Sequence, residues 1–122
     1  MVFFILTKKA KDYFLGLEGK NLNCYQSVVY TFKDVFNLVE EDIEEGLRFS
    51  GGRAPEGICG AIYAVKKLYE KKGNKDFDEF KNRFIEQNGS IICYEIRKKK
   101  KISCAECVEI ATEYLEKNNS SN

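Results

Sequence analysis

The sequence predicts an all-α fold, a compact single-domain bundle of about five to six helices, on the basis of three observations. Apolar residues recur at intervals of three and four residues through most of the chain, which is the period of a helix that packs on one face. No stretch alternates between apolar and polar residues for long enough to suggest a sheet. The 122 residues, 14.1 kDa in mass, match the size of one ordinary domain. We assign residues 1–117 to this domain and residues 118–122 to a frayed polar tail.

The helical pattern divides the chain into segments that span, in order, residues 8–17, 23–36, 40–47, 58–72, 77–88, 91–96 and 104–117. Within residues 40–47 we expect Ile43 and Leu47 to face inward, but Gly46 makes this helix weak. Residues 91–96 fit a strand as well as a helix, and we favour a helix because the neighbouring segments are helical.

Two helix starts and one break carry local signals. Ser103 followed by Glu106 fits a capping box, in which the hydroxyl and the carboxylate each accept a hydrogen bond from a backbone amide. Asn21 or Asn23 is a suitable N-cap for the second helix. Residues 50–57 read Ser-Gly-Gly-Arg-Ala-Pro-Glu-Gly, so we expect them to break regular structure.

The composition excludes several classes of function. Hydrophobic residues at 43% and charged residues at 32% are typical of a globular domain with a well-solvated exterior. The 20 basic and 19 acidic residues leave a net charge of +1, which provides no long-range field for nucleic acid, so we expect no nucleic-acid partner. Because the sequence contains no histidine, it lacks the commonest general base. The same absence excludes mixed cysteine–histidine zinc sites, Rieske centres and histidine-ligated haem.

The first six residues are apolar but do not resemble a targeting signal. They cover about one-third of the length of a membrane-spanning helix. Neither a charged segment nor a small-residue cleavage site flanks them, so we expect a cytoplasmic protein with no membrane partner. Because a short terminus would hardly expose such a run, we expect residues 1–6 to pack on the core or across the interface of a homodimer.

Five cysteines stand out from this background, namely Cys24, Cys59, Cys93, Cys104 and Cys107. In a reducing compartment such residues serve as metal ligands, redox-active thiols or small buried hydrophobic residues. The predicted helices place Cys24, Cys59 and Cys104 in or near a first turn, where unpaired amides and the helix dipole stabilise a thiolate. Metal binding and thiol–disulfide exchange both need the thiolate, so the group indicates a shared functional site. For any one of these cysteines taken alone, we favour simple core packing.

Several separated motifs resemble one protein family in order and approximate spacing. They are Asn23-Cys24-x-Gln26-Ser27-Val28, Gly51-Gly52, Gly57-x-Cys59-Gly60-Ala61, Phe84, Gly89-Ser90-Ile91-x-Cys93 and Cys104-x3-Val108-x2-Ala111. The family is C_GCAxxG_C_C, a group of redox-active proteins, and the resemblance covers about residues 10–115. It implies that four cysteines hold a redox site or an iron–sulfur cluster, and these carry over to Cys24, Cys59, Cys93 and Cys104.

Three features depart from the family pattern. Ala64 stands where the motif Cys-Gly-Ala-x-x-Gly ends in glycine, although a residue as small as alanine still suits close helix packing. Cys107 has no recognised counterpart, and it is either a substitute ligand, a resolving thiol, or a core residue one turn beyond Cys104. The basic connection at residues 97–101 is also shorter than in relatives.

The sequence leads us to expect an iron–sulfur protein for electron transfer or redox sensing rather than for turnover of a substrate. The expected ligands of a [2Fe–2S] or [4Fe–4S] cluster are Cys24, Cys59, Cys93 and Cys104, with Cys107 as a substitute metal ligand. An all-cysteine zinc site has the same ligand count. One alternative is a thiol–disulfide oxidoreductase in which Cys104 and Cys107, or a longer-range pair, cycle through a disulfide. Another is a structural or partner-binding helical module with buried cysteines.

Other motif matches fail at specific residues. The Cys104-x-x-Cys107 pair lacks the βαβ context of thioredoxin-like proteins, and Val108 stands where c-type haem attachment needs histidine. Ile58 and Cys59 occupy the positions that a phosphate-binding loop gives to lysine and to serine or threonine. We therefore expect neither a thioredoxin-like protein, nor covalent haem, nor nucleotide binding.

Two polar segments each have two interpretations. Residues 52–57 either form a nest of amides that stabilises an anionic group near Cys59, with Arg53 adding positive charge, or are a flexible connection. For residues 97–101 we favour a solvated turn, and the alternative is a patch that docks an acidic redox partner protein.

Overall fold

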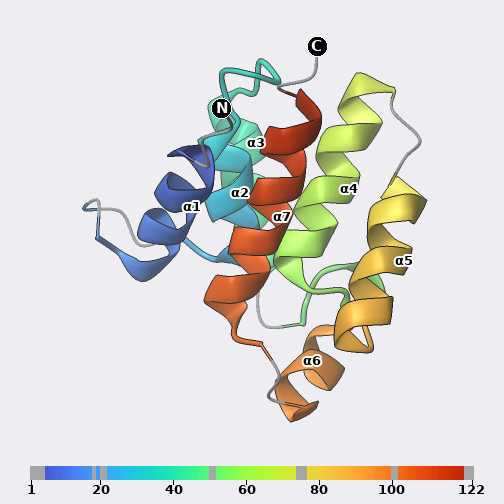
Figure 1. Ribbon diagram of the computed structural model, residues 1–122. Coiled ribbons are helices and arrows are strands. Elements are labelled where there is room, and N and C mark those ends of the chain that lie inside the picture. The colour runs from blue at the N-terminus through green and yellow to red at the C-terminus, as the bar shows by residue number, and fades with distance from the viewer. Residues whose placement is uncertain are drawn as a thin grey trace.

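The computed structural model describes residues 5–17, 19, 22–49, 52–73, 77–99 and 102–119. In these residues the chain folds into seven α-helices and no β-strand, which confirms the all-α prediction. The helices are α1 (Ile5–Leu15), α2 (Cys24–Thr31), α3 (Glu40–Glu45), α4 (Gly60–Lys72), α5 (Phe77–Asn88), α6 (Cys93–Lys99) and α7 (Cys104–Asn119) (Figure 1). Two short 3₁₀ turns, Gly46–Arg48 and Pro55–Gly57, lie between α3 and α4.

The count of seven corrects the expected five to six helices for the described part of the chain. The weak and the ambiguous segments both fold as short helices, α3 with six residues and α6 with seven. α6 has local support that periodicity does not reveal, because the Ser90 hydroxyl accepts a hydrogen bond from the Ile92 amide at 2.9 Å and donates one to the Glu95 carboxylate. This polar turn separates α6 from α5.

Helix α7 lies at the centre of the bundle, where it packs against α1, α2 and α4 (Figure 1). α2 also packs on α1 and α4, α5 lies beside α4, and α6 lies at the end of the bundle where α7 begins. The largest side chains that are fully buried between these helices are Phe32, Phe84, Ile62, Leu68 and Leu115. One core therefore holds helices from both ends of the chain.

Polar contacts tie the start of α2 to the end of α3. Asn23 is the N-cap of α2 and forms a capping box with Gln26, whose amide donates to the Asn23 side chain at 2.8 Å. The Asn23 side chain also donates to the Gly46 carbonyl at 2.8 Å, and the Gln26 side chain donates to the Ile43 carbonyl at 3.0 Å. The N-cap alternative Asn21 lies outside the described residues.

The prediction that Leu47 faces inward is wrong, whereas that for Ile43 is confirmed. Ile43 is 7% exposed and Leu47 is 62% exposed. At Gly46 the α-helix tightens into a 3₁₀ turn, which advances each residue by a larger angle and rotates Leu47 off the buried face. Gly46 itself packs against the ring of Tyr25, and a Cβ atom at this position would collide with that ring.

The central helix α7 begins where the capping box predicts. The Glu106 amide donates to the Ser103 hydroxyl at 3.1 Å, and the Ser103 amide donates to the Glu106 carboxylate at 3.1 Å. The helix continues to Asn119, two residues beyond the expected end at residue 117, and residues 120–122 lie outside the described part.

No helix in the described ranges is both long enough and apolar enough to cross a membrane. The expected packing of the apolar residues 1–6 concerns side chains outside the described part of the chain, so it stays a prediction.

Candidate functional site

Each of the four predicted ligands lies at the start of a helix. Cys24, Cys93 and Cys104 are the first residues of α2, α6 and α7, and Cys59 is the N-cap of α4. We expected this position for three of them, and the structure adds Cys93. All four, and Cys107, are free thiols. Backbone amides of the first turn act to lower the pKa of two of these thiols, Cys24 and Cys59, against the effect of burial.

These helix starts gather toward the end of the bundle that carries α6 (Figure 1). Ile58 and Ile92 form an isolated antiparallel bridge, and the Cys59 amide donates to the Ile91 carbonyl at 2.7 Å. This backbone pairing joins the segment before α4 to the segment before α6. It brings Cys59 toward Cys93, although their positions in the sequence differ by 34.

Gly60 allows α2 and α4 to begin in contact. A Cβ atom at Gly60 would lie 2.5 Å from the sulfur of Cys24 and 2.6 Å from the carbonyl oxygen of Phe49. Both distances are far below van der Waals contact, so only glycine leaves enough room. The sulfur of Cys24 consequently lies against the backbone next to Cys59.

The thiols influence one another electrostatically. Burial raises the pKa of the Cys24 thiol to about 12, and negative charge on Cys59, Cys104 and Cys93 adds to this effect. Burial, followed by Cys59 and Cys93, also raises the pKa of Cys104. Such effects fall with distance, so the four sulfurs share one neighbourhood. Negative charge accumulates there unless protons or a cation compensate for it.

Cys107 brings a fifth thiol into this neighbourhood. Its S–H group donates a hydrogen bond to the sulfur of Cys59, and this bond lowers the pKa of Cys59 to about 7. Burial opposes the shift, whereas the amides of Ile62 and Ala61 in the first turn of α4 support it. The same hydrogen bond, together with burial, raises the pKa of Cys107. The pair therefore loses its first proton from Cys59, while Cys107 keeps its own.

The arrangement of cysteines corresponds to a known family. The sequence model described as "Putative redox-active protein (C_GCAxxG_C_C)" matches residues 22–118. The chain belongs to this family. All five cysteines lie inside the matched segment. No curated protein and no solved structure matches the chain.

The Cys-Gly-Ala-x-x-Gly part of the family motif lies at the start of α4, and its two alanines, Ala61 and Ala64, lie in the core. Ala61 and Ala64 are both fully buried. Ala64, which replaces the last glycine of the family motif, is accommodated within the helix and its methyl group is covered by neighbouring side chains. A larger residue there would have to displace close-packed neighbours.

Two features of this family member were not revealed by its sequence. The first is the contact between Cys107 and Cys59, since the sequence left three roles open for Cys107. The second is Arg97 in α6, which lowers the pKa of Cys104 against the effect of burial. Its place in a basic run shortly before Cys104 was the available signal. The structure gives Arg53 a hydrogen bond to the Leu47 carbonyl at 3.4 Å, and its expected influence on Cys59 stays a prediction.

The loop before Cys59 is an irregular turn, as its composition predicts. Residues Gly52, Glu56 and Gly57 have left-handed φ angles of 85°, 61° and 75°. Pro55–Gly57 forms a single 3₁₀ turn. Residues 50 and 51 lie outside the described part. Within the described residues the structure shows no hydrogen bond from the amides of residues 52–57 to an anionic group near Cys59, so the nest stays a prediction.

The cysteines differ in access to solvent. Cys104 is exposed, whereas Cys24, Cys59, Cys93 and Cys107 are each 8% exposed or less. As the side chains lie, the described residues contain no group of three or more Cys, His, Asp or Glu arranged to hold a metal ion. The structure thus brings the predicted ligands into one neighbourhood without joining three of them around a common point, and the ligand set stays a prediction.

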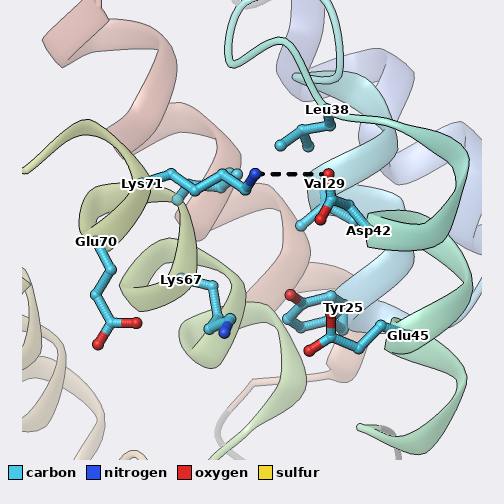
Figure 2. A pocket seen from close by; sticks show the side chains of 9 residues that line it. Tyr25, Val29, Leu38, Asp42, Glu45, Lys67, Glu70 and Lys71 are labelled. Atoms are coloured by element: carbon cyan, nitrogen blue, oxygen red, sulfur yellow. Dashed lines mark ion pairs between the residues drawn. The ribbon is translucent and has the colours of Figure 1, made fainter.

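A cavity of about 220 Å³ lies between α2, α3 and α4, separate from the thiols (Figure 2). Its mouth is crossed by an ion pair of 3.6 Å between Lys71 and Asp42, drawn as a dashed line. Tyr25 points into it beside Glu45, and burial followed by that carboxylate raises the pKa of Tyr25. The lining residues are Tyr25, Val29, Leu38, Asp42, Glu45, Lys67, Leu68, Glu70 and Lys71. None is a cysteine, so the cavity is not the predicted redox site.

Proposed function

We propose that this member of the C_GCAxxG_C_C family binds an iron–sulfur cluster through Cys24, Cys59, Cys93 and Cys104 and serves electron transfer or redox sensing. The observation that carries the proposal is that four cysteines at four separate helix starts lie close enough for Cys59, Cys93 and Cys104 to act on the pKa of Cys24. Redox activity is the description of the family itself.

The chemistry of the donors supports a cationic group at this place. In the metal-free protein the pKa of Cys24 is raised to about 12, so a bound metal ion would replace a proton there. Cys59 already favours the thiolate that metal binding needs. Four thiolates suit a [2Fe–2S] cluster, a [4Fe–4S] cluster or a zinc ion.

Different side chains and amides would have different roles at such a site. Cys24, Cys59 and Cys93 are buried and would hold the group away from water, while the exposed Cys104 would lie at its solvent edge. Amides at the helix starts and the nearby Arg97 would stabilise added negative charge, which raises a reduction potential. Binding requires the thiol side chains to turn toward a common centre. The bound cluster would supply a one-electron carrier.

The exposed basic end of α6 supports a site for a protein partner. Arg97, Lys98 and Lys99 are all exposed, and Arg97 lies within electrostatic range of the exposed Cys104. An acidic redox protein that docks on these residues would therefore approach the solvent edge of the proposed site. Free thiols also suit a reducing compartment, so we propose a cytoplasmic location.

Anaerobic purification followed by visible absorption and iron and sulfide analysis tests the proposal. We expect a coloured protein with iron and acid-labile sulfide in equal amounts, either as isolated or after reconstitution. A protein that stays colourless and binds neither element after reconstitution contradicts it. Stoichiometric zinc in the isolated protein, with no iron bound after zinc removal, would instead favour a structural metal site.

A further inference from the structure

Cys59 and Cys107 form a buried pair of free thiols joined by a hydrogen bond. Cys107 donates its S–H hydrogen bond to Cys59, and the two residues are 1% and 5% exposed, respectively. They come from α7 and from the start of α4, two helices that pack on each other in the core. The pairing is therefore a product of the tertiary fold and not of local sequence.

The backbone on both sides of this pair is well anchored. The Cys107 amide donates to the Ser103 carbonyl at 3.0 Å within the capped first turn of α7. The Cys59 amide donates to the Ile91 carbonyl, and its carbonyl accepts from the Tyr63 amide at 2.8 Å. Both sulfurs therefore extend from anchored backbones into the same core and share a hydrogen bond. A disulfide requires the two side chains to rotate from this contact to the bonding distance of about 2.05 Å.

We infer that in the metal-free protein Cys59 and Cys107 close to a reversible disulfide, which withdraws Cys59 from the proposed ligand set and so controls loading of the site. The regulatory part of this inference rests on the proposed function, whereas the pairing itself does not. Cys107 has no counterpart in the family motif as we recognise it, so this control would be specific to chains that carry the extra thiol.

Hydrogen peroxide is a small oxidant that can convert the two thiols to a disulfide in two steps. The Cys59 thiol first releases its own proton, and the thiolate sulfur then attacks one peroxide oxygen, so that an S–O bond forms and the O–O bond breaks. The hydroxide that leaves takes up the proton released by Cys59 and becomes the first water. The sulfur of Cys107 then attacks the sulfenic sulfur of Cys59, so that the S–S bond forms, the S–O bond breaks and a second water leaves with the Cys107 proton. The two thiols lose two electrons, and one peroxide becomes two waters. A dithiol reductant reverses the change by thiol–disulfide exchange.

Peptide mapping of the full-length, metal-free protein tests the pairing. We would treat the anaerobically reduced chain with one equivalent of hydrogen peroxide, block the remaining thiols and identify linked peptides by mass spectrometry. The expected result is a bond between Cys59 and Cys107 that a dithiol removes, and the same bond in the Cys104→Ser control. A dominant bond between any other two cysteines, or oxidation of Cys59 without a bond, overturns the inference.

Iron uptake tests the regulatory part. Oxidised wild-type protein should bind less than about one-tenth of the iron and sulfide that the reduced protein binds. The loss of a mere supporting contact already lowers the affinity of a metal site by about tenfold or more. The Cys107→Ser or Cys107→Ala variant should load equally before and after the same treatment. Equal loading of oxidised and reduced wild-type protein overturns the control. Failure of the reduced protein to load contradicts the proposed function as well, while the mapped bond is judged without any metal.

Discussion

Gly60 shows at the residue scale how one missing side chain shapes the candidate site. The space for a Cβ atom is already occupied by the Cys24 sulfur and the Phe49 carbonyl oxygen. The Gly60→Ala variant should therefore lower the free energy of unfolding by about 1–3 kcal/mol, the usual cost of overpacking. Urea denaturation of the reduced, metal-free protein measures this cost.

A double-mutant cycle supplies the control for Gly60→Ala. Removing the sulfur in Cys24→Ala relieves one of the two collisions, so the cost of Gly60→Ala should fall in that background by a measurable coupling energy. Additive effects of the two changes would show that the helix starts are not in contact as described.

The ionisation of Cys59 should make stability depend on pH. The folded protein lowers this pKa to about 7 from an ordinary value of 9.0, so the folded state favours the thiolate. The resulting contribution to stability is complete above pH 9 and is lost as pH falls through 7. Urea unfolding without metal measures this effect. The difference in unfolding free energy between wild type and Cys59→Ser should fall by about 1–2 kcal/mol as the pH is lowered from 9 to 7.

A titration of thiolate absorbance checks the cause of this pH effect. The Cys107→Ser variant keeps a hydroxyl donor, whereas Cys107→Ala removes the hydrogen bond to Cys59. The pKa of Cys59 should therefore stay lower in the serine variant and rise in the alanine variant. Identical titrations of wild type and Cys107→Ala would contradict the assigned cause.

At the scale of elements, the two capped helix starts should differ in strength. Both Asn23 and Ser103 accept a hydrogen bond from an amide three residues on, but Asn23 also donates to the Gly46 carbonyl. Ser103→Ala should cost about 1 kcal/mol and Asn23→Ala about 2 kcal/mol of unfolding free energy, since typical caps span this range. Thermal or urea unfolding of the two variants gives the comparison.

Substitution of a second good cap provides the control at each position. Ser103→Thr and Asn23→Asp each keep an oxygen acceptor for the amide, so both should retain most of the capping energy. Only Asn23→Asp loses the donor to Gly46, and it should therefore recover less than Ser103→Thr does. Equal costs for the two alanine variants would show that the link to Gly46 contributes nothing.

Local signals predicted where helices start better than how they end. The Ser103 cap is visible in the sequence because its partner Glu106 lies one turn away. The end of α2 at Thr31, five residues before the expected residue 36, depends on a turn that leads to a left-handed Asn37. Leu47 was misplaced for a similar reason, because the change to a 3₁₀ turn at Gly46 is set by packing against Tyr25. Such endings depend on tertiary contacts that periodicity does not contain.

At the scale of the whole molecule, the bundle gives the cysteines their common place. The central position of α7 against α2 and α4 brings the segments of Cys24, Cys59 and Cys107 together from distant parts of the sequence (Figure 1). The helix pattern and the family resemblance were enough to predict an all-α fold and to select the four shared cysteines. Neither could pair Cys107 with Cys59 or set Arg97 near Cys104, because these relations arise only when α4, α6 and α7 assemble.

Iron and acid-labile sulfide per chain, measured across single Cys→Ser variants reconstituted without oxygen, test the central claim most directly. Variants at Cys24, Cys59, Cys93 and Cys104 should each lose most of the bound iron, since every one of these positions supplies a proposed ligand. Cys107→Ser, matched to them in chemistry, should keep the wild-type iron content and visible spectrum. Loss of iron in Cys107→Ser with full retention in any two of the other four variants would contradict the proposed ligand set.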